Sequence, residues 1–161
     1  MATRAVLLPY AAEFGTANFP QLLLSNRRPA LAFDASTSET CYWTGVAPQG
    51  LSGTATAVIS YAMASATSGG VAFDVAIEAL TSGDAVDTDT TTSFDSVNGG
   101  SDAAVPGTAG HMEQLSITLT NADSLAAADY FRLSLARDVA DAADTATGDC
   151  YVFAVEFRDA A

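Results

Sequence analysis

Two acidic stretches contain the residues whose type and spacing best suit cation binding. Residues 138–149 carry four aspartates, residues 84–95 carry four more, and neither stretch holds a basic residue. Carboxylate oxygens are preferred ligands of Ca²⁺, and a shared ion would relieve the repulsion among them. If both loops cluster at one end of the fold, the candidate calcium ligands are Asp84, Asp87, Asp89, Asp141 and Asp144.

The spacing also fits a simpler role. An EF-hand loop needs acids at alternate positions, a central glycine and a late bidentate glutamate. In residues 138–149 the aspartates are three, three and five positions apart, Gly148 comes late, and no glutamate follows in place. Aspartate, threonine and glycine are also good turn formers. The spacing therefore favours a solvated turn between two strands, with no metal and no cofactor.

Groups that could act as catalysts are few. His111 is the one histidine, no G-x-S-x-G pattern occurs, and a phosphate-binding Gly–Lys loop is impossible because the chain has no lysine. The glutamates at 39, 78, 113 and 156 fall mostly on polar faces of expected strands, where a carboxylate is normally solvated. We expect a protein without catalytic residues. A hydrolase built on His111 or on a carboxylate pair is the alternative.

Four aromatic side chains suit either a core or a sugar-binding surface. Tyr42, Trp43, Tyr61 and Tyr130 all lie in expected strands, where packing against the opposite sheet is the usual role. On an exposed face the same rings would stack on pyranose rings. A carbohydrate-binding, host-attachment module is therefore the alternative function.

The elements that must position these residues are strands. Apolar and polar residues alternate in "VAFDVAIEAL", "LSITLT", "YFRLSLAR" and "CYVFAVEFR", as in half-buried antiparallel strands. Glycine-rich clusters such as "TSGG", "VNGGSD" and "VPGTAG" separate them. The pattern predicts an all-β, antiparallel, jelly-roll-like β-sandwich. Its expected strands are 30–34, 39–47, 54–65, 71–80, 92–97, 115–120, 130–137 and 150–158.

The two cysteines lie in an early and a late expected strand. No second Cys or His stands at metal-ligand spacing, which disfavours zinc. Alternation puts Cys41 on the face of Trp43, but puts Cys150 opposite Tyr151 and Phe153. If the aromatic rings all point inward, the thiols face different ways. A disulfide between them stays open as the alternative.

Charge limits the partners. The 161 residues are 49% hydrophobic and only 16% charged, with a net charge of −13 and arginine as the sole basic type besides His111. Such a surface repels nucleic acid and anionic membranes. No apolar run approaches the ~18 residues of a transmembrane helix.

The first part of the chain differs from the rest. Residues 1–33 hold three arginines and one glutamate, whereas residues 34–161 hold three arginines and eighteen acidic residues. We expect an extended N-terminal arm over 1–29, ahead of a sandwich domain over 30–161, that docks on an acidic neighbour such as another copy of the chain. A chance placement of three arginines is the alternative. "FPQLLLSN" can add a strand to a sheet edge, its own or a neighbour's. The expected contact residues of the arm are Arg4, Leu7, Leu8, Leu22, Leu23, Arg27 and Arg28.

Several segments between residues 30 and 159 carry a resemblance. They are "AFDASTSETCYWTGVAPQGLSG", "VPGTAG", "SITLTNADSLAAADYFRLSLARD", "DAADTATGD" and "FAVEFRD". Together they resemble short β-sandwich proteins encoded among the structural genes of tailed bacteriophages. The resemblance implies a non-enzymatic virion component with a jelly-roll-like sandwich, and supplies no functional residues.

Such proteins commonly decorate or cement the capsid, often as trimers, or form head or tail appendages. We therefore expect a capsid decoration (cement) protein located in the virion. Its expected partners are the major capsid protein or other virion subunits, and copies of itself, with a trimer favoured.

Overall fold

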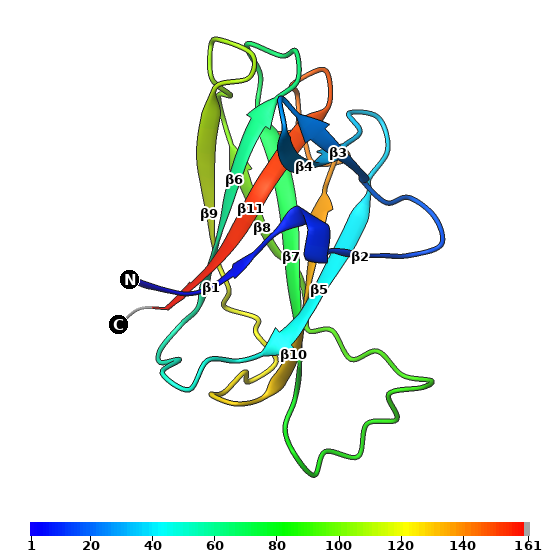
Figure 1. Cartoon of the computed structure of the whole chain (residues 1–161), viewed down its shortest axis with the longest axis vertical. Coiled ribbons are helices and arrows are strands. Elements are labelled where there is room, and N and C mark those ends of the chain that lie inside the picture. The colour runs from blue at the N-terminus through cyan, green and yellow to red at the C-terminus, as the bar shows by residue number, and fades with distance from the viewer. Residues whose placement is uncertain (160–161) are drawn as a thin grey trace.

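Two antiparallel sheets pack face to face in a computed structural model that describes residues 1–159 (Figure 1). Sheet A has the strand order β3-β4-β11-β6-β9, and β1 also pairs with β11. Its strands are β1 (Ala2–Leu7), β3 (Gln21–Ser25), β4 (Arg28–Phe33), β6 (Thr56–Met63), β9 (Met112–Thr118) and β11 (Cys150–Asp159). Sheet B has the order β2-β5-β10-β7-β8. Its strands are β2 (Glu13–Phe14), β5 (Thr40–Val46), β7 (Val71–Leu80), β8 (Asn98–Asp102) and β10 (Tyr130–Arg137). A single 3-10 turn, η1 (Pro9–Ala11), lies between β1 and β2.

The expected β-sandwich is confirmed, and its core lies between the two sheets. Aromatic rings from opposite sheets meet there: Phe33 contacts Phe73 edge to face, and Phe131 stacks on Phe157, each pair with centroids 5.6 Å apart. Burying one such side chain contributes about 1.5–3 kcal/mol, so these pairs hold the sheets together.

The pairing from β4 to β11 is nested. β4 pairs with β11, β5 with β10, β6 with β9, and β7 with β8. The registers place the connections 47–55, 81–97 and 119–129 at one end of the sandwich. The connections 64–70, 103–111 and 138–149 lie at the other end (Figure 1).

One side of the sandwich is closed by a close approach of β8 to β9. A Cβ added to Gly100 of β8 would lie 2.6 Å from Cγ1 of Ile117 in β9, so a larger residue at this position would require the Ile117 side chain to shift. The opposite side is bordered by the two edge strands β2 and β3.

The separate arm expected over residues 1–29 is not formed. β4 pairs only with Cys150–Val152 of β11, which leaves the following part of that β11 edge available to β1. β1 pairs there from Leu7 opposite Val155 to Ala2 opposite Asp159. β2 pairs with β5, and β3 pairs with β4. Residues 1–29 therefore complete this chain's own sheets.

The expected inward facing of β11 is wrong for Tyr151 and Phe153 but confirmed for Val155 and Phe157, because the pairing of β11 with β6 is irregular between these two halves. The register shifts between Val152 and Ala154, as in a β-bulge, which moves later residues to the other face. Cys150 and Val152 therefore point into the core, as do Val155 and Phe157 beyond the shift. Cys41 is also in the core, and both thiols are free.

The strand expected at 92–97 is wrong as well. These residues form irregular chain, and the strand follows at Asn98–Asp102, where a turn had been expected. Asn98 is buried, and its amide donates to the carbonyls of Val75 and Asn121. The tight fit of Gly100 and these hydrogen bonds outweigh the low strand propensity of "NGG".

Candidate functional site

The two acidic stretches lie at opposite ends of the sandwich. Residues 138–149 follow the end of β10, whereas residues 84–95 follow the end of β7 that pairs with the start of β10. The length of the eight-residue β10 separates them, roughly 25 Å. Asp84, Asp87 and Asp89 therefore cannot share a calcium ion with Asp141 and Asp144. Within residues 1–159 no three His, Cys, Asp or Glu side chains are grouped to hold a metal ion.

One member of the 138–149 loop is internal instead of solvated. Arg137 and Asp144 are almost fully buried and form a two-point ion pair, Nε to Oδ2 at 2.9 Å and Nη2 to Oδ1 at 2.8 Å. Arg137 also donates to the carbonyls of Ala146 and Gly148, and Asp144 accepts the amide N–H of Ala72. This pair holds the loop against β7, so its role is structural.

The sequence contained a signal for this pair. In "YFRLSLAR" Arg137 has the same parity as Phe131, Leu133 and Leu135, so alternation alone turns it toward the core. A buried guanidinium needs a buried carboxylate. The partner could not be chosen from four nearby aspartates.

The candidate acid–base residues are dispersed. His111 and Glu113 are exposed near the start of β9. Glu39 accepts the N–H of Asp34, but burial raises the pKa of its carboxyl above the usual range. Hydrogen bonds from Thr3 and Arg158 lower the pKa of Glu156. These positions do not form a carboxylate pair.

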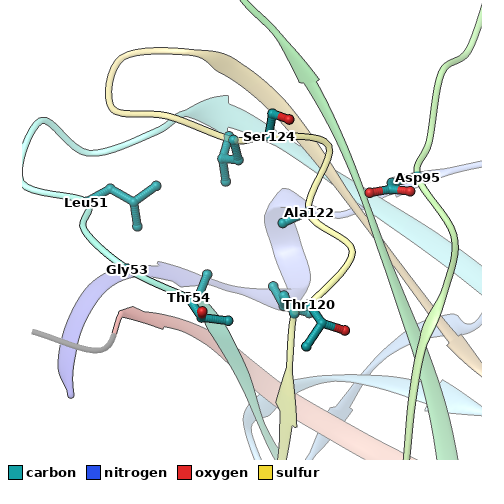
Figure 2. A pocket seen from close by; sticks show the side chains of 10 residues that line it. Leu51, Gly53, Thr54, Asp95, Thr120, Ala122 and Ser124 are labelled. Atoms are coloured by element: carbon teal, nitrogen blue, oxygen red, sulfur yellow. The ribbon is translucent and has the colours of Figure 1, made fainter.

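A hollow of about 590 Å³ opens at the end formed by the 47–55 and 119–129 connections. In Figure 2, Leu51, Gly53 and Thr54 stand across from Thr120, Ala122 and Ser124. Its one ionisable lining residue is Asp95, whose carboxylate accepts the N–H groups of Ser96 and Asp123. These bonds lower the pKa of Asp95, and the lining holds no second titratable side chain with which Asp95 could exchange a proton.

A more polar cleft, of about 320 Å³, lies between the outer face of sheet B and the 81–97 connection. Glu13, Glu78, Tyr130 and Arg132 line its sheet side. Sequence reasoning placed Glu78 on a solvated face, yet it is 3% exposed. The reason is that the connection covers it: Oε1 of Glu78 accepts the N–H of Ser93 at 2.6 Å.

The four candidate aromatic residues are divided between core and surface. Trp43 and Tyr61 are buried between the sheets. Tyr61 donates to Asp102, and burial raises the pKa of its hydroxyl. Tyr42 and Tyr130 are on the outer face of sheet B, beside the cleft and the acidic connection.

The first three of the arm's expected contact residues, Arg4, Leu7 and Leu8, make contacts within the chain itself. Arg4 pairs with Asp159, Nε to Oδ2 at 2.8 Å. Leu7 is part of the core, and the carbonyl of Leu8 accepts the indole N–H of Trp43. These residues fasten the N-terminal strand to the sandwich and are not offered to a partner.

The remaining expected contact residues, from Leu22 to Arg28, lie at the surface. Leu22, Leu23 and Leu24 of β3, with Tyr10 and Pro29, line an apolar groove of about 530 Å³, here called the β3 groove. Leu24 is 70% exposed and Tyr10 67%. β3 is also the last strand of its sheet, so one row of its backbone groups faces outward.

Two arginines stand at the turn next to this groove. Asn26 and Arg27 have φ values of 46° and 69°, the left-handed conformation of a type I′ hairpin turn, where glycine is favoured at the second position. The other four arginines form ion pairs within the chain. Arg27 and Arg28 are exposed and form none among the residues that the structure describes.

No helical segment within residues 1–159 has the length and apolar character needed to cross a membrane. A scan of protein-family models and a search of curated proteins found no match to this chain.

Proposed function

We propose that this chain is a non-enzymatic structural protein of a bacteriophage virion, a capsid decoration protein that stabilises the head through subunit contacts. The observation that carries the proposal is the β3 groove, an exposed apolar surface beside two arginines that form no ion pair within residues 1–159. Exposed apolar surface of this kind marks interaction sites. The resemblance over residues 30–159 and the nested, jelly-roll-like strand pairing support the same function.

The occupant of the groove is a second copy of the chain. The chain carries a net charge of −13, and Arg27 and Arg28 are exposed. Because residues 34–161 hold eighteen acidic residues and three arginines, the body of the next copy complements these two charges. The groove then binds a different, acidic surface of the next copy, and such a heterologous contact forms a ring where the rotation between copies closes. A trimer is the favoured ring, and it would place the sandwiches side by side on the head.

Sedimentation velocity tests the groove. We expect a trimer for the unaltered chain, and folded monomers for Leu24→Asp and for the double variant Arg27→Glu/Arg28→Glu. Val46→Asp is the matched control, because Val46 is 64% exposed on β5 of the other sheet; this variant stays trimeric. Raised salt should weaken the unaltered trimer, since its charge contacts are exposed. A monomeric unaltered chain, or a trimer that survives both groove variants, would contradict the proposed assembly.

A further inference from the structure

The cleft on sheet B lies apart from the β3 groove, and its floor is formed by paired strands. Its floor side chains come from β2, β5, β7 and β10, and Thr88, Thr91 and Thr92 of the 81–97 connection face them. Its volume of about 320 Å³ is at the lower end of small-molecule sites. One sugar ring, with the remainder of a saccharide in solvent, matches that size.

Arg132 is anchored in the cleft but only loosely paired. Its guanidinium lies 5.2 Å from the ring centroid of Tyr42 and 5.3 Å from that of Phe94. Its contacts to carboxylates are long, 3.4 Å to Glu78 and 4.0 Å to Glu13. Charge-assisted pairs usually close to about 2.7–2.9 Å. Arg4, Arg137 and Arg158 all reach that range, so Arg132 retains N–H donors for a further acceptor.

Acceptors stand beside these donors. Ser93 fixes the carboxylate of Glu78 through its N–H and its hydroxyl, and Glu13 is half exposed at the cleft. Neighbouring hydroxyl groups of a sugar can donate to a carboxylate while they accept from a guanidinium. Two carboxylates around one guanidinium leave a negative balance, which disfavours an anionic ligand.

An aromatic face completes the set. Tyr130 lines the cleft and is 42% exposed, so its ring can pack on the C–H face of a pyranose. We propose that the cleft between sheet B and the 81–97 connection binds one neutral pyranose unit of a saccharide, through Arg132, Glu13, Glu78 and Tyr130. The inference does not depend on the β3 groove or on assembly.

Saturation-transfer difference NMR on the full chain tests this site. The probes are glucose, galactose, mannose, rhamnose and N-acetylglucosamine, each at millimolar concentration. We expect at least one of them to receive saturation from the unaltered protein. Arg132→Met should bind it at least about tenfold more weakly, a change of about 1.4 kcal/mol. Arg158→Met is the matched control, because Arg158 is 27% exposed against 24% for Arg132 and belongs to the other sheet; binding should be unchanged.

A second variant separates a loss of sugar binding from a loss of the folded structure. Glu13→Gln removes a half-exposed charge whose contact to Arg132 is already 4.0 Å, so the thermal transition should stay in place while binding weakens. The proposal is overturned if none of the five sugars binds the unaltered chain. It is equally overturned if Arg132→Met and Glu13→Gln bind as well as the unaltered chain.

Discussion

Arg137 and Asp144 form a two-point ion pair with both side chains almost fully excluded from solvent. The pair joins the end of β10 to the acidic connection that follows it, and Asp144 also accepts a hydrogen bond from Ala72 of β7. A stretch that looks like a solvated or cation-binding loop is thus fastened from within by one aspartate.

Asp144→Ala should therefore destabilise the fold strongly. The change leaves Arg137 buried without its counter-charge, which costs about 3–5 kcal/mol. Asp149→Ala is the control, because Asp149 is exposed in the same connection, and its effect should stay within about 0.5 kcal/mol. Denaturant unfolding measures both. Similar free energies of unfolding for the two variants would show that the pair is not a major contact.

Gly100→Ala should also destabilise, because the new Cβ would lie 2.6 Å from Cγ1 of Ile117 in the β9 strand. Overpacking of this kind costs about 1–3 kcal/mol. Gly107→Ala is the matched control, since a Cβ at Gly107 meets no atom within 4 Å. Thermal unfolding of both variants checks the closed side of the sandwich, and an unchanged transition for Gly100→Ala would contradict the close approach.

Asp74 should make stability depend on pH. Burial, followed by the charges of Asp138 and Asp141, raises the pKa of this carboxyl. The folded chain therefore holds the proton more tightly than the unfolded chain does. The contribution of Asp74 to the free energy of unfolding is fully present below the pKa of about 3.9 that the carboxyl has in the unfolded chain. It is lost as the pH rises through the higher pKa of the folded chain.

Asp74→Asn removes this penalty. We expect a higher transition temperature than that of the unaltered chain at about pH 7 and little difference at about pH 3. Asp89→Asn, in the exposed 81–97 connection, is the control. The sign is refuted if Asp74→Asn is less stable than the unaltered chain at neutral pH.

Both cysteines should resist modification in the folded chain. Burial raises the pKa of the thiols of Cys41 and Cys150, and the thiolate is the reactive form. Titration with a thiol reagent should find almost no reaction under native conditions and two thiols after denaturation. Two unreactive sulfurs after denaturation without reductant would instead indicate a disulfide.

Alternation of apolar and polar residues was enough to predict a β-sandwich, because each main strand turns one row of apolar side chains toward the single core between the two sheets. It failed where pairing was irregular. The shift between Val152 and Ala154 has no mark in the pattern, and it moved Cys150 into the core.

The expected sites failed for a related reason. Asp89 and Asp144 look alike in sequence, and only the register of β10 with β7 places them at opposite ends. The cleft could not be predicted because the 81–97 connection, which packs over Glu78 and forms one wall, has no periodic pattern in its sequence. Tyr130, in contrast, was named as a candidate and does line that cleft.

A cryo-EM reconstruction of the phage particle to which the proposed function assigns this chain tests the central claim most directly. We predict density for the two-sheet sandwich on the outer surface of the head, in rings of three, with the β3 groove and Arg27 and Arg28 against the neighbouring copy. Absence of the chain from purified particles, or a bound chain whose β3 groove faces solvent, would contradict the account.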